Sequence, residues 1–292
     1  MLLDTIRIAI MILISIIYAY FDVFNKRNIP NSFAYIGIVI AAILTLAYPQ
    51  PTIIYSIVVA AIVAVIFYVF YRTGQVGAGD GFELVTISLL LPIQPTPILQ
   101  STQILMPFNS PFVLSVFIAT GIVTLIGVPI YYLLISKNTG IKDVSKKPEN
   151  ARKNLIKATA ILLAYLLLYF SLVQFFGPNL YGAVIILLMG IFSAITIMYS
   201  RKINSKMVSM KKASSLEEGD MIATNFISSK MLASLSKKYN GFGNLVTGKL
   251  AIQLKRSNVK LPVYQNSVPL SLSILAAVII SLLIGNLLFL VI

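Results

Sequence analysis

The sequence contains no cysteine, histidine or tryptophan. Without cysteine, the chain can form neither a disulfide framework nor a thiolate metal site. Without histidine, it lacks the commonest metal ligand and the base of Ser-His and Cys-His nucleophile systems. Any catalytic chemistry must therefore use carboxylates, lysine, tyrosine, serine or threonine, and we expect neither a metal nor a cofactor.

Charge is also scarce, because charged residues make up 11% of the 292 residues whereas hydrophobic residues make up 58%. Long apolar runs predict an all-α polytopic membrane protein with about eight transmembrane helices. The first run lacks a cleavage site of small residues, so we expect a retained helix. The fourth run either stops partway through the bilayer or continues past Pro92. The predicted helices are 5–21, 33–48, 52–71, 81–93, 112–136, 155–176, 179–199 and 268–291.

Basic residues gather in the connections on one side of this helical layout. These connections are 22–32, 72–80, 137–154 and 200–267, whereas 48–51, 94–111 and 176–179 carry no lysine or arginine. The positive-inside rule places the first set in the cytoplasm and both termini outside a cell membrane that the chain crosses several times. The net charge of +14 then reflects topology and attraction to anionic lipid heads. We therefore expect membrane lipids, and no nucleic acid, as partners.

The same layout predicts four parts along the chain. Residues 1–136 form a membrane core with the candidate catalytic residues, 137–199 a basic cytoplasmic loop and an additional helix pair, 200–267 a small cytoplasmic domain, and 268–292 a last transmembrane helix. Within the small domain "MIATNFI", "LVTGKLAIQL" and "VKLPVYQ" favour strands, which predicts a β-rich unit. Its first part, 200–214, is typical of a basic extension of the seventh helix along the membrane.

Only nine residues are acidic, and three of these lie where predicted helices meet the membrane surface. Asp22 ends the first helix in "YAYFDVFNKRNIPNSF", and Asp80 opens the fourth in "VGAGDGFELVTISLLLP". The topology places both at the cytoplasmic face, where ionisable groups usually face the bundle interior, pair or bind something. Glu83 follows one turn later and either joins the site or is an interfacial charge that tunes Asp80 or pairs with Arg72.

The residues alone leave several roles open for this pair. Asp80 could cap a helix and Asp22 could pair with Lys26 one turn along. Both could be ion or proton sites of a transporter, or belong to a non-catalytic membrane scaffold. If the two carboxylates meet, they share one proton, so that one activates water while the other polarises a peptide carbonyl.

The flanking residues suit such a site. Gly77 and Gly79 permit close approach of backbone and substrate, and Pro30 ends the first helix and fixes a turn beneath Asp22. A position at the N-terminus of a helix favours the ionised form of Asp80.

Two stretches resemble a known family. "FDVFNKRNIPN" resembles the D-x(5–6)-[IV]-P-N segment of type IV prepilin peptidases, and "GAGD" fits their G-x-G-D motif. These membrane aspartic peptidases are similar to archaeal preflagellin (class III signal) peptidases and, more distantly, to presenilin-type proteases. The resemblance covers 22–31 and 77–80, and the helical layout of 1–136 is compatible with it. It implies that Asp22 and Asp80 are the catalytic dyad.

The resemblance also implies a substrate class and a reaction. It implies an aspartic endopeptidase that removes short basic leaders from prepilin-like or preflagellin-like precursors, just before an apolar helix. Many bacterial members carry a Cys-rich insert after the first helix and also N-methylate the new terminus. Here the first loop is short and cysteine is absent, so we expect the archaeal-like, peptidase-only form. "GFE" follows Asp80 where many relatives have a small residue and lysine.

Overall fold

The computed structural model describes residues 2–25, 29–73, 76–99, 110–135, 151–239, 241–255, 257–264 and 270–285. All eight apolar runs form helices in it, which confirms a mostly helical chain. Their bounds are α1 Leu2–Phe24, α2 Asn31–Thr45, α3 Gln50–Arg72, α4 Ala78–Leu90, α5 Phe112–Ile130, α6 Ala151–Phe176, α7 Leu180–Met198 and α11 Leu270–Leu283. The predicted basic cluster of 137–153 falls largely outside the described residues.

Five helices in the described part of the chain are long and apolar enough to cross a membrane: α1, α3, α5 with its π-helical end Tyr131–Ile135, α6 and α7. Helices α2 and α11 are apolar but shorter. With 13 residues, α4 is about 20 Å long, short of the roughly 30 Å hydrocarbon core. The helix of the fourth run ends at Leu90 and does not continue past Pro92. A stop partway through the bilayer and the count of eight spans stay predictions.

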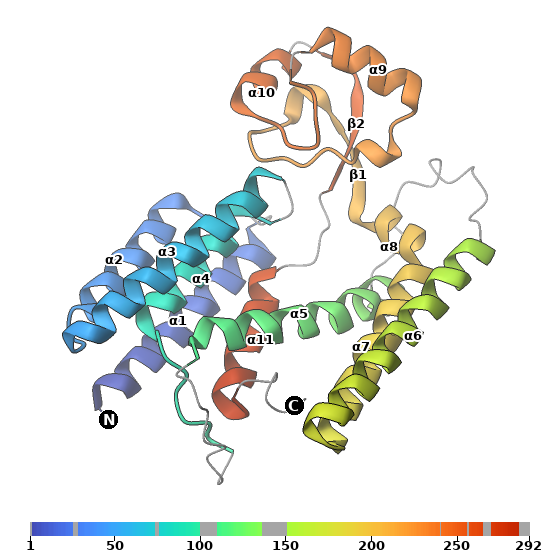
Figure 1. Ribbon diagram of the computed structural model, residues 1–292. Helices are drawn as coiled ribbons and strands as arrows, with labels where there is room; N and C mark the ends of the chain where they lie inside the picture. Colours follow the sequence, from blue (N-terminus) through green and yellow to red (C-terminus); the bar gives the residue numbers. More distant parts are fainter. Residues whose placement is uncertain are drawn as a thin grey trace.

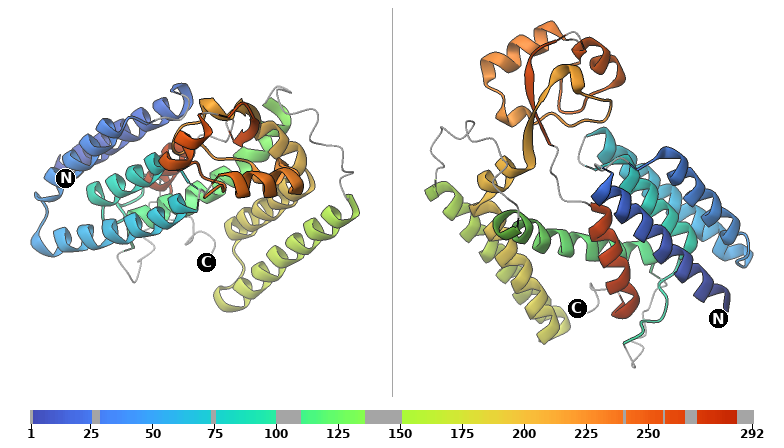
Figure 2. Two further views of the ribbon diagram at one scale, coloured as in Figure 1. Left: turned by 90° about the horizontal axis from the view of Figure 1, so that it is seen from above. Right: turned by 180° about the vertical axis from the view of Figure 1, so that it is seen from behind.

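Helices α1 to α4 and α11 form one bundle (Figure 1). Helix α11 lies antiparallel beside α1 (Figure 2), and α5 packs on α11 and leads across to the α6–α7 hairpin. The buried core of the bundle is lined mainly by α1, α4, α5 and α11, with Met11, Tyr18, Leu84, Ile87, Leu90, Phe112, Val116, Ile274 and Val278 among its members. Burial of α4 on all sides makes its polar residues depend on partners within the protein.

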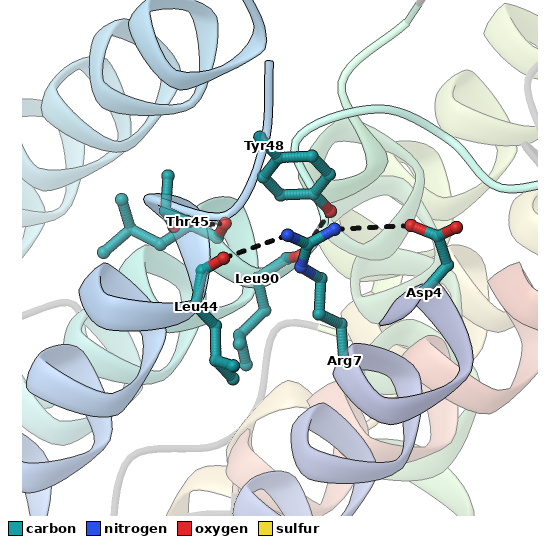
Figure 3. Close-up of polar contacts among 7 residues, drawn as sticks. Asp4, Arg7, Leu44, Thr45, Tyr48 and Leu90 are labelled. Carbon is teal, nitrogen blue, oxygen red and sulfur yellow. Dashed lines mark hydrogen bonds and ion pairs between the residues drawn. The ribbon is translucent and has the colours of Figure 1, made fainter. Parts of the chain in front are cut away.

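A buried arginine joins three elements at the end of the bundle where α1 begins (Figure 3). Arg7 Nη2 donates to the Leu44 carbonyl at 3.0 Å, and Nη1 lies 3.4 Å from a carboxylate oxygen of Asp4. Its guanidinium carbon lies 3.3 Å from the ring centroid of Tyr48, whose hydroxyl donates to the Leu90 carbonyl at 2.9 Å. The starting end of α1 is thereby tied to the ends of α2 and α4.

Replacing Arg7 by methionine is expected to destabilise the protein by about 2–3 kcal/mol, since a charge-assisted hydrogen bond and a desolvated cation–π contact are lost. Unfolding in mixed micelles with increasing sodium dodecyl sulfate measures the change. Arg72→Met is the control, because Arg72 is exposed at the end of α3, and its effect should stay within about 0.5 kcal/mol. Equal effects of both variants would contradict a structural role for the Arg7 contacts.

A small folded unit follows α7 and lies beyond the end of the bundle at which α4 and α11 begin (Figure 1). Helix α8, Ser200–Met207, leads into strand β1, Val208–Lys212, which pairs antiparallel with β2, Lys260–Tyr264. Between the strands lie the 3-10 helices η2, Ala213–Ser215, and η3, Thr224–Phe226, and the α-helices α9, Ser229–Lys238, and α10, Gly248–Leu254. The unit has its own core, formed by Ala213, Leu216, Ile222, Leu235, Tyr239, Val246, Leu250, Ala251, Leu254, Leu261 and Val263.

The prediction of a β-rich unit is wrong, because the described part contains more α-helix than strand. "VKLPVYQ" does form β2, but "LVTGKLAIQL" forms α10, where the Thr247 hydroxyl caps the helix by accepting the Leu250 N–H at 3.4 Å. "MIATNFI" forms only isolated bridges and a 3-10 turn. The basic extension predicted for 200–214 is helical only as α8, since Val208–Lys212 forms β1. Lys206 of α8 is buried and donates to the Tyr132 carbonyl at 2.6 Å.

Candidate active site

The two predicted catalytic carboxylates are both buried in the described structure. Asp22 lies in the last turn of α1 and is 7% exposed, and Asp80 is the third residue of α4 and is 9% exposed. The start of α4 at Ala78, three residues earlier than predicted, places Asp80 within the first helical turn. There the free N–H groups and the helix dipole favour a negative charge.

Ser271, in the first turn of α11, connects Asp22 and Asp80. Its backbone N–H donates to Asp22 Oδ2 at 3.0 Å, and its hydroxyl donates to Asp80 Oδ1 at 3.0 Å. The N and Oγ atoms of one serine are separated by only three covalent bonds, and each donates one of these hydrogen bonds. Asp22 Oδ2 and Asp80 Oδ1 therefore lie within about 10 Å of each other. The fold therefore brings together two residues that the sequence places on separate helices.

Gly77 occupies the N-cap position of α4, so the alternative that Asp80 is itself the cap is wrong. The Gly77 N–H donates to Asp80 Oδ2 at 3.2 Å. This is half of a capping box, since glycine has no side chain to return a hydrogen bond. Asp80 thus accepts hydrogen bonds from a backbone N–H and from the Ser271 hydroxyl. The alternative pairing of Asp22 with Lys26 lies outside the described residues.

The segments of the two motifs pack against each other. A Cβ atom added to Gly79 would lie only 3.2 Å from Cβ and Cγ1 of Ile29 and would overlap the end of that side chain. The next residue, Pro30, is the N-cap of α2, and its carbonyl accepts the N–H groups of Phe33 and Ala34. Gly79 is therefore needed for close approach to the chain between α1 and α2.

Glu83 is fully buried, and both of its carboxylate oxygens lack a hydrogen-bond partner among the described residues. The predictions that it is an interfacial charge or pairs with Arg72 are therefore wrong. Arg72 is exposed at the end of α3. Glu83 lies three residues after Asp80 and so shares its face of α4, which points into the bundle. The remaining prediction, that Glu83 joins the site, fits this position.

The match to known proteins falls on this part of the molecule. Residues 9–128 match the model of the type IV leader peptidase family, and they include Asp22, Asp80 and Glu83. This stretch of the chain is therefore similar to that family. The leader-peptidase match covers less than half of the chain and ends within α5. No curated protein and no solved structure gives a significant match.

The similarity to this family supports a leader peptidase role, in which precursor proteins are the substrates. Together with the long apolar helices, it supports a protein that crosses a membrane several times. Nothing in the structure or in the family match favours the transporter alternative. Other buried charges in the described part, Arg7 and Lys206, are held by carbonyl groups away from the site.

Ser271 lies outside the leader-peptidase match, and sequence reasoning missed it. It stands 249 residues from Asp22 and 191 from Asp80, so no local pattern links it to either. Its only signal in the sequence is polarity, since "LSLSILAAVIISLL" is apolar apart from its serines. A serine on an apolar helix usually bonds a carbonyl of its own helix, which gave no reason to single it out.

Proposed function

We propose that this protein is a membrane aspartic endopeptidase in which Asp22 and Asp80 form the catalytic dyad. The observation that carries the proposal is the convergence of both carboxylates on Ser271, one on its N–H and one on its hydroxyl. Two carboxyl groups held close in a buried site share one proton, because both cannot stay ionised there. The titration then belongs to the pair.

Asp80 is suited to be the ionised member. It accepts the Gly77 N–H and the Ser271 hydroxyl and lies in the first turn of α4. It takes a proton from water as that water attacks the carbonyl carbon, while protonated Asp22 hydrogen-bonds the carbonyl oxygen and gives it its proton as the carbon becomes tetrahedral. On collapse, Asp80 returns its proton to the leaving amine and Asp22 recovers one from the intermediate, so the pair ends as it began.

The proposed substrates are prepilin-like or preflagellin-like precursors with a short basic leader and an apolar helix. The positive-inside pattern supports a site on the cytoplasmic side. The small unit of 208–264 lies near the same end of the bundle (Figure 1), and we propose that this unit is the cytoplasmic domain. A leader bound between this domain and the end of the bundle would present the peptide bond to be cut at the membrane surface.

The test is co-expression with a tagged precursor that carries a basic leader before an apolar helix. Mass spectrometry of the product should show loss of the leader just before the apolar helix, with no added methyl group. A matched precursor whose leader lysines and arginines are replaced by serine should be cut more slowly. The proposal is overturned if folded wild-type protein leaves every precursor intact, or if the cut falls deep within the apolar helix.

A further inference from the structure

Glu83 has no role in the two-carboxylate mechanism, although it is the most completely buried acidic residue of the described chain. Its side chain is 0% exposed, and neither oxygen has a hydrogen-bond partner there. Buried polar groups of native proteins are nearly always satisfied, so an exception beside a reactive site needs an explanation. A carboxylate ion in this position would lose its hydration without any compensating donor.

Unpartnered hydroxyl groups surround this carboxyl group. Ser15 and Tyr18 are both fully buried, and neither hydroxyl has a hydrogen-bond partner in the described structure. Ser15 and Ser271 lie beside Glu83, without completing the geometry of a hydrogen bond. The Ser271 hydroxyl has its single proton committed to Asp80, so toward Glu83 it can only accept.

The charges around Glu83 disfavour its ionised form. The titratable groups that act on it are Asp80 on its own helix and Asp22 and Tyr18 on α1. None of these brings a positive charge. Of the described cations on the helices packed around α4, Arg7 is held at the opposite end and Arg72 is exposed. A neutral carboxyl group, in contrast, has an O–H to donate to the acceptor side of Ser271.

We propose that Glu83 is a positioning residue that stays protonated in the active enzyme and donates its O–H to Ser271 Oγ. The Ser271 hydroxyl is then fixed toward Asp80, and its polarised O–H stabilises the ionised Asp80 carboxylate. When Glu83 loses its proton at higher pH, it places a second negative charge beside Asp80 and no longer donates to Ser271. Deprotonation of Glu83 thus switches off the site and sets the alkaline limit of cleavage. The inference rests on the proposed aspartic peptidase function.

The activity test compares the pH profile of precursor cleavage for Glu83→Gln, Glu83→Ala and wild type in membranes. The glutamine amide still donates to Ser271 but cannot ionise, so this variant should keep most of the neutral-pH rate. Its alkaline half-point should move up by about one pH unit or more. Glu83→Ala lacks the donor and should lose about tenfold in rate, the equivalent of about one hydrogen bond between neutral groups.

Ser271 provides the second arm of this test. Ser271→Ala removes the hydrogen-bonded link, so adding Glu83→Ala to it should cause no further loss of rate at neutral pH. Ser281→Ala is the matched control, because Ser281 is a fully buried serine further along α11, and its profile should equal that of wild type. An unchanged alkaline limit in Glu83→Gln would overturn the inference while leaving the peptidase function standing.

Infrared spectroscopy gives a readout that needs no precursor. The wild-type spectrum at neutral pH should contain a protonated-carboxyl band that is missing from Glu83→Gln. Absence of that difference overturns the inference, whether or not cleavage is observed. A wild-type protein that shows the band but cuts no precursor would instead overturn the proposed function, and with it the role given to Glu83.

Discussion

Replacing Asp22 or Asp80 by asparagine is expected to lower precursor cleavage by at least about 10³-fold. Asparagine has the size of aspartate but can neither ionise nor exchange a proton with its partner. Because the two carboxylates act as one unit, the double variant should be no slower than the slower single variant. Rates are measured from the product N-terminus at equal protein levels.

The same substitutions should leave the fold in place. An asparagine carbonyl can still accept the Ser271 N–H at position 22 or the Ser271 hydroxyl at position 80. Asp4→Asn is the matched control, since Asp4 lies on α1 at the end away from the site and is exposed; its cleavage rate should stay near that of wild type. A single dyad variant that keeps a tenth of the wild-type rate would sink the two-carboxylate mechanism.

The helical layout was predictable because apolar runs of membrane length carry a strong signal. The burial of Glu83 was not, because it depends on where α4 begins. A start at 81 would put this residue in the first turn at the surface, but the actual start at Ala78 carries it one turn deeper. An error of three residues at a helix end therefore changed an interfacial charge into a buried one.

Ser271 marks a different limit of sequence reasoning. The resemblance singled out Asp22 and Asp80 through local motifs, each of which sits at the end or start of a helix. The residue that joins them comes from α11, at the far end of the chain. The position of Ser271 depends on the packing of α11 against α1. The hydrophobicity of a helix indicates that the helix is buried, but not which residues of other helices surround each of its side chains. Long-range contacts of this kind become visible only in the folded chain.

In the small unit, the local signals themselves conflicted. "LVTGKLAIQL" contains the β-formers Val246 and Thr247, but it also contains a threonine just before a run of helix formers. That threonine acts as an N-cap for α10, so the capping signal outweighed β-propensity. Strand preference depends on context more than helix capping does, which explains why only the segment with a pairing partner, at β2, formed a strand.

The contact between Gly79 and Ile29 leads to the second large effect. Glycine to alanine within a helix normally stabilises a protein by up to about 1 kcal/mol. At position 79, however, the new methyl group would collide with Ile29, in the chain segment that follows Asp22. A displacement of about 1 Å between catalytic groups can lower a rate by about 10²-fold. Gly79→Ala should therefore slow cleavage by about that factor and also lower stability.

The collision can be relieved from the other side. Ile29→Ala removes the atoms that the new methyl group would meet beyond Cβ, so the double variant Gly79→Ala with Ile29→Ala should recover most of the lost rate. Gly121→Ala serves as the control, because no atom lies within 4 Å of its added Cβ and its activity should not fall. The two motif segments are not positioned by this contact if Gly79→Ala cleaves as fast as wild type. The same holds if adding Ile29→Ala to Gly79→Ala does not restore the cleavage rate. Recovery would show that the glycine of the motif serves the spacing between the helices that carry Asp22 and Asp80.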